Sequence, residues 1–327
     1  MQNNNENEHS GGHVLDVNNY SLSIKKGKKY INILNGMDFY IDKGEVLGVV
    51  GESGCGKSMT ALSIMHLING ETKTEGSIMF NGKNILNATK KEMLNIRGNE
   101  ISMIFQEPMT SLNPVLTIGE QLSEVFMAHS RISKKDAYAK ALDALKLVKI
   151  AEPEKRIKCY PHELSGGMRQ RVMIAMALSS NPKLLIAHEP TTALDVTIQA
   201  QILELIRDLQ KKLDTSVMFI THDLGVVAEV CKRAVILYCG HVVEEGNVEE
   251  LFSNPLHPYT EGLLESLPDI GKHEKLSMIP GNVPSTGNYP SGCPFHPRCK
   301  YATEKCRTQA PVMKTLDNGR KVCCWRV

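Results

Sequence analysis

Short apolar runs of strand length alternate with stretches of helical spacing over most of the chain. The strand-like runs lie at 45–50, 101–105, 183–187, 216–220 and 234–237. The helical stretches lie at 57–69, 118–149, 167–178, 196–213 and 223–231. A chain in which strands alternate with helices forms a mostly parallel sheet covered by helices. The pattern therefore predicts an α/β fold.

The two ends of the chain depart from this alternation. Residues 14–51 resemble a series of short strands, with glycine-containing turns at 26–28 and 42–44. After Phe252 the composition shifts toward proline, glycine and serine, and only one short helix is expected, at 261–267.

A domain boundary is therefore expected near Phe252. It separates a domain at 13–253 from a loop-rich extension at 254–327.

Composition limits the classes of partner and location. The chain of 327 residues has a formal net charge of only +2, so no strong field attracts it to nucleic acid or acidic lipid. No apolar run approaches the roughly 20 residues that span a bilayer. Residues 1–12 are rich in asparagine and glutamate without an apolar segment, which argues against a signal peptide. A cytosolic protein is predicted, which reaches a membrane only through a partner.

A glycine-rich octet follows the strand-like run at 45–50 and precedes the helical stretch at 57–69. It reads Gly-Glu-Ser-Gly-Cys-Gly-Lys-Ser at 51–58, which fits the phosphate-loop pattern G-x-x-x-x-G-K-[ST]. In such a loop the backbone amides surround phosphate oxygens, Lys57 reaches the β and γ phosphates, and Ser58 binds Mg²⁺. A glycine-rich turn is the alternative for the octet alone, and Cys55 is a small residue of the loop rather than a nucleophile. The expected ATP contacts are Ser53, Gly54, Cys55, Gly56, Lys57, Ser58 and Met59.

A second anion-binding pattern lies at 164–171. The sequence Leu-Ser-Gly-Gly-Met-Arg-Gln-Arg places Ser165, Gly166 and Gly167 directly before a helix, where backbone amides can bind an anion. Taken alone, the pattern is equally consistent with a helix cap in which Ser165 is the N-cap residue.

Six elements in this order resemble the ABC family. They are the phosphate loop, Gln106, the LSGG signature at 164–167, Glu189-Pro190, the segment 193–195 and Thr221-His222-Asp223. The resemblance implies a P-loop (RecA-like) ABC ATPase core with an antiparallel β subdomain and an α-helical signature subdomain at about 109–165. It also implies a head-to-tail pair of cassettes, in which the phosphate loop of one and the signature of the other enclose each ATP.

The resemblance also implies roles for individual residues. Gln106 corresponds to the residue that senses Mg²⁺ and the attacking water, Glu189 to the catalytic base, and His222 to the switch histidine at the γ-phosphate. Taken singly, Gln106, His222 or Asp195 is better explained by a solvated or capping role, whereas their joint occurrence favours the site. The remaining expected contacts, on the signature side and at the subunit interface, are Ser165, Gly166, Gly167, Gln170 and Asp195.

Two positions depart from the family pattern. His188 stands where the family has an aspartate that holds Mg²⁺ through water, and a neutral imidazole there is expected to weaken support for Mg²⁺ more than ATP binding. The aromatic residue that stacks on adenine has no clear counterpart. Its position falls on Ile24, with Tyr20 and Tyr30 as substitutes.

The C-terminal extension indicates which group of ABC proteins the chain resembles. The segments 254–260, 279–284 and 292–299 are similar to the C-terminal extension of dipeptide and oligopeptide permease ATPases. This implies a motor subunit on the cytoplasmic face of the cell membrane, with membrane-spanning permease subunits, an extracytoplasmic substrate-binding protein, and a second ATPase subunit or a second copy as partners. The transported solute cannot be read from the sequence.

The cysteines of the extension form a separate candidate site. Cys293, Cys299, Cys306 and Cys324 lack the Cys-x-x-Cys spacing of structural zinc sites. The resemblance implies a [4Fe–4S] cluster on these four residues, with zinc as the second choice and free thiols as the third. Cys323 is adjacent to Cys324, so the fourth ligand is open between them, and the family pattern favours Cys324.

The predicted function is ATP hydrolysis that powers a peptide importer. One alternative is a regulatory subunit of the same transporter that binds ATP but hydrolyses it weakly, which His188 favours and Glu189 and His222 oppose. The other is a soluble ABC ATPase of DNA repair or translation. Such proteins usually carry two cassettes, whereas this chain has one set of motifs and no basic patch, so no nucleic-acid partner is expected.

Overall fold

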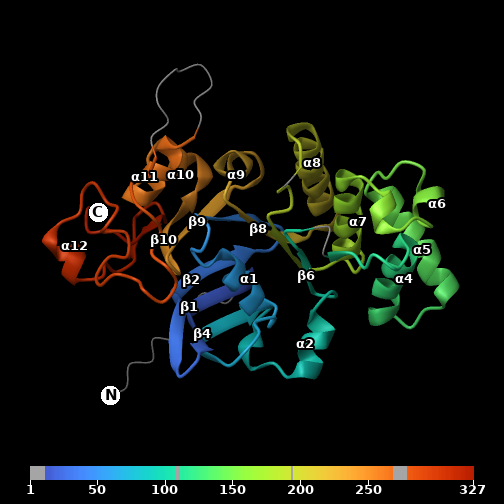
Figure 1. Ribbon diagram of the computed structural model, residues 1–327, viewed down its shortest axis with the longest axis horizontal. Coiled ribbons are helices and arrows are strands. Elements are labelled where there is room, and N and C mark those ends of the chain that lie inside the picture. The colour runs from blue at the N-terminus through green and yellow to red at the C-terminus, as the bar shows by residue number, and fades with distance from the viewer. Residues whose placement is uncertain (1–11, 108–110, 193, 268–277) are drawn as a thin grey trace.

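The computed structural model describes residues 12–107, 111–192, 194–267 and 278–327. The expectations for residues 1–11 and for Ala193 lie outside the described residues. Two sheets form the centre of the molecule, and helices cover the larger one (Figure 1).

The larger sheet has eight strands in the order β11-β12-β10-β9-β3-β8-β7-β6. The five strands from β9 to the edge strand β6 are parallel and almost entirely buried, which confirms the prediction of a mostly parallel sheet. They are β3 (Val46–Val50), β6 (Ile101–Ile104), β7 (Leu184–His188), β8 (Ser216–Thr221) and β9 (Arg233–Tyr238). Parallel strands buried on both faces are continuous apolar runs, which is why the sequence pattern found them.

Helices connect these strands and pack on the sheet. They are α1 (Lys57–Ile64), α7 (Gly166–Leu178), α8 (Val196–Leu213), α9 (Leu224–Val230) and α10 (Val248–Ser253). The prediction that the first helix continues to residue 69 is wrong. The helix ends at Ile64 because His66 adopts a left-handed conformation with φ 49°, which a helix cannot continue through.

The smaller sheet is antiparallel, in the order β2-β1-β4-β5. Its strands are β1 (His13–Lys26), β2 (Lys29–Asp42), β4 (Thr72–Phe80) and β5 (Lys83–Asn84), followed by η1 (Ile85–Asn87) and α2 (Lys90–Ile96). The expectation of several short strands is wrong, because β1 and β2 have 14 residues each and are joined by a tight turn at Gly27, where φ is +64°. Irregular register within the pair interrupts the alternation of apolar residues along the sequence.

A group of helices extends to one side of the larger sheet (Figure 1). It contains α4 (Ile118–His129), α5 (Lys134–Leu147), α6 (Pro153–Arg156) and η2 (Pro161–Glu163). The single helical stretch expected at 118–149 is two helices. The break occurs because Ser130 is extended and Ser133 caps α5 by accepting the Asp136 amide, so the chain reverses between them.

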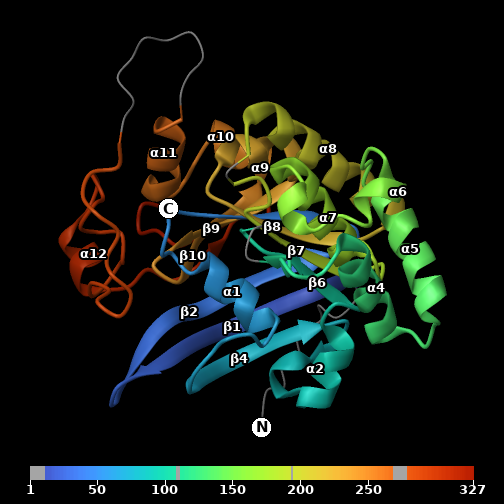
Figure 2. The ribbon, with the colours of Figure 1, turned by 45° about the vertical axis from the view of Figure 1, so that its right-hand side comes forward.

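The C-terminal part packs against the opposite side of the molecule (Figure 2). It contains β10 (His241–Asn247), α11 (Pro258–Glu265), α12 (Glu304–Thr308), β11 (Lys314–Thr315) and β12 (Lys321–Val322). The short helix expected at 261–267 begins three residues earlier, at Pro258. β12 pairs with β10, so the extension adds strands to the larger sheet. Among the described residues, no helix is long and apolar enough to cross a membrane.

Candidate functional site

The phosphate loop joins the end of β3 to the start of α1. Gly56 has φ +111°, and a Cβ there would lie 2.7 Å from Leu34 Cδ2, so the turn requires glycine. Lys57 Nζ donates to the main-chain carbonyls of Gly51 at 2.6 Å and Glu52 at 3.0 Å. The ammonium group is therefore held inside the loop, at the N-terminus of α1.

The other predicted loop residues form a rim and a floor. Ser53, Gly54 and Ser58 are exposed, whereas Gly56 and Met59 are partly buried. Cys55 is fully buried, and burial raises the pKa of its thiol. A buried, protonated thiol is a poor nucleophile, as expected for a small packing residue.

His188 lies directly beside the loop. It is the last residue of β7, it is 7% exposed, and its Nε2 lies 2.8 Å from Ser58 Oγ. Burial lowers the pKa of His188, and the nearby charge of Lys57 lowers it further, against the opposing effect of Glu189. His188, which replaces the aspartate of the family pattern, therefore contacts Ser58, the residue expected to bind Mg²⁺.

Three polar side chains converge on Glu189. Gln106 Nε2 and Thr192 Oγ1 donate to its Oε2 at 3.0 and 2.9 Å, and His222 Nδ1 lies 3.2 Å from its Oε1. Gln106, Glu189 and His222 follow β6, β7 and β8 respectively, so the carboxyl ends of parallel strands bring them together. Thr192 was missed by sequence reasoning, because a hydroxyl three residues after a glutamate is an unremarkable loop residue.

The backbone and charge of Glu189 are also defined. The residue has φ +47°, unusual for a non-glycine residue, and its amide donates to the Ile220 carbonyl at 2.8 Å. Burial alone would raise the pKa of Glu189, but hydrogen bonds from Thr192 and His222 and the positive charge of Lys57 lower it below the ordinary value. The carboxylate is ionised at neutral pH and can accept a proton or polarise a water molecule.

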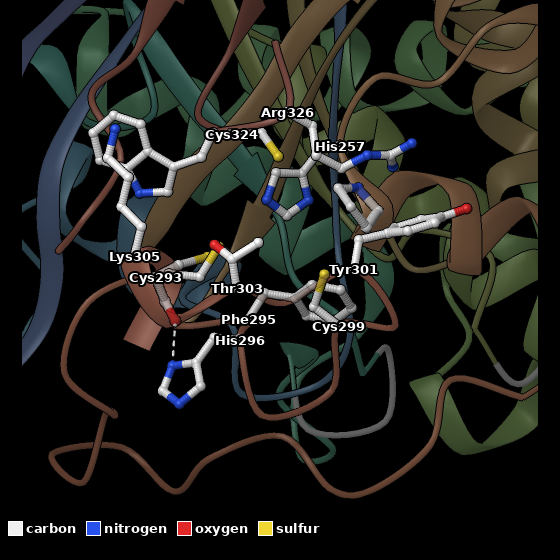
Figure 3. Close-up of a pocket in the computed structure, with 13 residues that line it drawn as sticks. His257, Cys293, Phe295, His296, Cys299, Tyr301, Thr303, Lys305, Cys324 and Arg326 are labelled. Carbon is white, nitrogen blue, oxygen red and sulfur yellow. Dashed lines mark hydrogen bonds between the residues drawn. The ribbon is translucent and has the colours of Figure 1, made fainter. Parts of the chain in front are cut away.

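The cysteines of the extension surround one cavity of about 170 Å³. Cys293, Cys299, Cys306 and Cys324 line it, together with His257, Phe295, Tyr301 and Trp325. Figure 3 shows the sulfur atoms of Cys293, Cys299 and Cys324 on different sides of this space. Burial raises the pKa of Cys293 to about 12 and also raises the pKa values of Cys299 and Cys324. The fold thus brings four cysteines of the C-terminal segment 293–324 to one site.

Comparison with known proteins identifies the family. A family model described as ABC transporter matches residues 34–192, and one described as the C-terminal region of oligopeptide/dipeptide transporters matches residues 243–306. The oligopeptide transport ATP-binding protein AppD of Bacillus subtilis is 55% identical over 95% of this chain and 96% of its own length. The chain belongs to the ABC transporter ATP-binding proteins.

Further matches agree with this family. The oligopeptide transport ATP-binding protein OppD of Haemophilus influenzae is 48% identical, over 95% of this chain and 97% of its own. Among solved structures, the dimeric ATP-binding cassette MJ0796 bound to ADP and Pi has a TM-score of 0.64 and 30% identity, over 72% of this chain and 98% of that one. CbiO1 of Clostridium perfringens has a TM-score of 0.64 and 26% identity, over 75% and 92%. The fold is that of an ABC cassette, and the protein is an ABC-type ATPase.

The signature of this ABC ATPase lies away from its own phosphate loop. Both ribbon views place α7 among the helices beside the sheet, apart from α1 (Figures 1 and 2). Ser165 caps α7 by accepting the Met168 amide at 3.3 Å, and Asp195 caps α8 by accepting the Ile198 amide at 3.0 Å. The capping roles considered from the sequence are therefore real, and both side chains remain exposed.

Gly167 and Gln170 position the signature helix α7 against α8 and against the loop that follows Glu189. A Cβ at Gly167 would lie 2.8 Å from Ile198 Cγ2, so this glycine allows α7 to approach α8 closely, and Gly166 is partly exposed beside it. Gln170 is 1% exposed and donates to the Pro190 carbonyl at 2.5 Å. The residue after Glu189 is thus fastened to the signature helix.

The three candidates for adenine stacking differ in environment. Tyr20 is 1% exposed, within the core beneath the antiparallel sheet, so this candidate is wrong. Tyr30 donates to Glu71, and Lys73 Nζ lies 4.2 Å from the centre of its ring. Ile24 packs at the edge of the same core. Tyr30 and Ile24 remain candidates.

The cysteine cavity of the ABC ATPase differs from a site for a single metal ion. Within the described residues, no group of three or more His, Cys, Asp or Glu side chains is arranged to hold one ion. The described residues therefore provide no preformed metal site for either the [4Fe–4S] cluster or zinc, the first and second choices from the sequence. Cys323 does not line the cavity, because its thiol donates to the Pro311 carbonyl at 3.2 Å. Of the two adjacent cysteines, Cys324 is the one that faces the cavity.

Proposed function

We propose that this ATPase powers the uptake of oligopeptides or dipeptides across a membrane. The observation that carries the proposal is the joint presence of the Gln106–Glu189–His222 cluster and a C-terminal segment that matches the oligopeptide/dipeptide transporter model. The partners are membrane-spanning permease subunits, an extracytoplasmic substrate-binding protein, and a second cassette, either another copy or a related subunit. Contact with the permease holds the protein on the cytoplasmic face of the membrane.

The residues of one chain account for half of each ATP site. Loop amides at 53–59 and Lys57 bind the phosphates, and Glu189 accepts a proton from the attacking water. His222 is hydrogen-bonded to Glu189 and assists at the γ-phosphate. Ser58 and Gln106 would hold Mg²⁺, which when bound would supply positive charge next to the phosphate oxygens. The Ser58 hydroxyl is exposed and Gln106 is bonded to Glu189, so the oxygen ligands that Mg²⁺ prefers are available.

The other half of the site comes from the second cassette. The exposed Ser165 and the amides of Gly166 and Gly167 face a nucleotide bound on the partner's phosphate loop, and Asp195 lies at the interface. Gln170 links the signature helix to the loop after Glu189. Binding of the partner's nucleotide at the signature can therefore change the position of Glu189, the catalytic base of this chain. The dimeric state of the related cassette MJ0796 supports this arrangement.

Peptide uptake by the reconstituted transporter tests the proposal. The complex with Lys57→Ala should lose ATP-dependent uptake of a labelled oligopeptide. Lys43→Ala, at the opposite end of β3, should not, because Lys43 pairs only with the exposed Asp214. ATP binding without hydrolysis by the unmodified pair would support the regulatory alternative. Failure to copurify with permease subunits would support a soluble ABC ATPase and overturn the proposal.

We also propose that the cysteine cavity holds a [4Fe–4S] cluster on Cys293, Cys299, Cys306 and Cys324. The support is that all four cysteines line one cavity. The cluster would supply folding energy to a segment with little regular structure.

Metal analysis of the anaerobically purified protein tests this second proposal. About four iron and four sulfide per chain are expected, which is the content of one cubane cluster. Cys324→Ala should lower the iron content, whereas the neighbouring Cys323→Ala should retain it because its thiol faces Pro311. Stoichiometric zinc without sulfide, or equal iron loss in both variants, would overturn the cluster.

A further inference from the structure

The C-terminal extension reaches the phosphate loop through a buried arginine. Arg298 Nη1 and Nη2 donate to the two carboxylate oxygens of Glu52, at 2.6 and 3.1 Å. The Arg298 side chain is only 4% exposed, and its Nε donates to the Pro280 carbonyl at 3.0 Å. Paired, parallel hydrogen bonds of this kind fix the orientation of a carboxylate as well as its position. Glu52, the second residue of the loop octet, is thus held from outside the cassette motifs.

A second group from the same region holds the main chain of Glu52. The Glu52 amide donates to the Tyr259 hydroxyl at 2.8 Å, and Tyr259 is fully buried in α11. The carbonyls of Gly51 and Glu52 accept the hydrogen bonds of Lys57. Arg298 and Tyr259 therefore position the part of the loop that orients the phosphate-binding lysine.

The same segment forms a wall of the cysteine cavity. Cys299 follows Arg298 directly, and Phe295 lines the cavity beside it. The centre of the Phe295 ring lies 5.4 Å from that of Tyr259 and 5.2 Å from that of Tyr238. These three rings connect the cavity to Tyr259, which holds the Glu52 amide. Figure 3 shows Phe295 close to Cys299 at the cavity. The packing of the extension and the shape of the phosphate loop are thus physically connected.

We propose that Arg298 and Tyr259 are positioning residues of the ATP site, which make nucleotide binding depend on the folded C-terminal extension. Releasing Glu52 frees the start of the loop, so part of the binding free energy of ATP is spent on ordering it. The interaction is present before the transition state forms, so its loss weakens ATP binding more than it slows the bound reaction. The proposal rests on the ATP site of the proposed function but does not require the iron–sulfur cluster.

Steady-state ATPase kinetics of the assembled transporter test the proposal. Arg298→Lys keeps the charge but cannot make the paired contact. We expect it to raise KM for ATP about tenfold, within the usual range of coupling between sites, with kcat changed by less than about twofold. The matched control is Arg233→Lys, because Arg233 also makes a paired contact, from Nε and Nη2 to the two carboxylate oxygens of Glu45 at 2.9 Å, at the opposite end of the strands. Arg233→Lys should lower the free energy of unfolding without changing KM for ATP.

A milder variant and a second readout cover a failure of Arg298→Lys to fold. Tyr259→Phe removes only the acceptor of the Glu52 amide, and we expect a rise in KM of about threefold, near the loss of one hydrogen bond. Because coupling is reciprocal, bound nucleotide should slow amide exchange at 293–299 in the unmodified protein and slow it less in Glu52→Gln.

The outcomes separate this inference from the proposed function. Wild-type KM in both Arg298→Lys and Tyr259→Phe, with Lys57→Ala inactive, overturns only the positioning role. Equal KM shifts in Arg298→Lys and Arg233→Lys also overturn it, because the effect would then be general destabilisation. Full hydrolysis by Lys57→Ala would instead contradict the ATP site itself.

Discussion

The nucleotide site and the cysteine cavity are built on different physical principles. Gln106, Glu189 and His222 each follow a buried parallel strand, so the ladder of backbone hydrogen bonds brings them within reach of one another. The cavity cysteines lie on loops and on the five-residue helix α12, where local contacts such as the 2.8 Å bond from the Cys293 amide to the Cys306 carbonyl hold them. Side chains at strand ends are positioned by the sheet and need no ligand to hold them. Side chains on loops depend on contacts with the rest of the molecule.

Two buried arginines of the extension form ion pairs with the cassette. Arg298 pairs with Glu52, and Arg320, 5% exposed, donates to the fully buried Glu244 at 2.7 Å. A buried pair is costly to break because the remaining charge is left uncompensated. The comparison predicts that damage to the nucleotide site changes chemistry but not folding, and that damage to the cysteine cavity does the reverse.

The largest expected effect is on the chemistry at Glu189. Glu189→Gln should lower the ATPase rate about 10²- to 10⁴-fold, because an amide cannot accept the proton from water. Its shape still accepts the Thr192 hydrogen bond, so ATP binding and cassette pairing should persist and the closed dimer should accumulate. Single-turnover hydrolysis and size-exclusion chromatography with ATP measure both. Glu229→Gln, on the exposed face of α9, is the control. An undiminished rate in Glu189→Gln would mean that another group is the base.

The next effect concerns the extension. If the cavity holds the proposed cluster, its anaerobic removal with a chelator should speed proteolysis within 278–327 about 100-fold. This is the increase in the unfolded fraction expected when a ligand present at about 100 times its Kd is lost. Cuts within the parallel sheet should not accelerate. Timed digestion followed by mass spectrometry locates the cuts. Equal acceleration in both regions would contradict the comparison, because the two regions would then unfold together.

A smaller effect is expected at His188, which tests whether the nucleotide site is complete. His188→Asp should raise the Mg²⁺-dependent ATPase rate about tenfold. A carboxylate beside Ser58 can accept hydrogen bonds from the water ligands of Mg²⁺. Changes to such residues around the direct ligands alter metal affinity about 10- to 100-fold. The gain should be smaller with Mn²⁺, which accepts imidazole more readily. Electron paramagnetic resonance of Mn²⁺ bound with ATP, with and without competing Mg²⁺, gives a readout independent of turnover. No gain in rate or in Mg²⁺ competition would show that Glu189 already serves the ion.

The last prediction concerns stability rather than activity, and is a pH dependence through His257. Burial lowers the pKa of His257 to about 3, and its Nδ1 accepts the Tyr259 amide at 3.0 Å. The unfolded histidine has a pKa near 6.5, so between about pH 6.5 and 3 the unfolded chain binds a proton that the folded chain does not. Stability is therefore lost as pH falls below about 6.5, by at most about 1.4 kcal/mol per pH unit.

The variant His257→Asn isolates this contribution. Asparagine is a good N-cap residue and keeps an acceptor for the Tyr259 amide, but it does not titrate. Urea unfolding at pH 7 and pH 5 should show a smaller loss of stability in the variant. An equal loss in both proteins would assign the acid sensitivity to other groups.

Much of the cassette could be predicted because its signals are local. Buried parallel strands are apolar runs, and the phosphate loop is a continuous octet, so neither requires knowledge of distant contacts. Errors arose where a local pattern was ambiguous. The helical spacing at 57–69 continues past Ile64 although His66 ends the helix, and the spacing at 118–149 conceals the break before Ser133. The irregular register of β1 and β2 similarly concealed two long strands.

The sequence by itself determined the parallel sheet, the position of Lys57 at a helix N-terminus and the set of residues at the strand ends. Only the tertiary structure decided that Thr192 holds Glu189, that His188 contacts Ser58, and that Cys324 rather than Cys323 faces the cavity. It also decided that Arg298 binds Glu52, 246 positions earlier in the chain. Backbone conformation follows from nearby residues, whereas these contacts depend on side-chain direction and on the packing of distant segments, which no local pattern encodes.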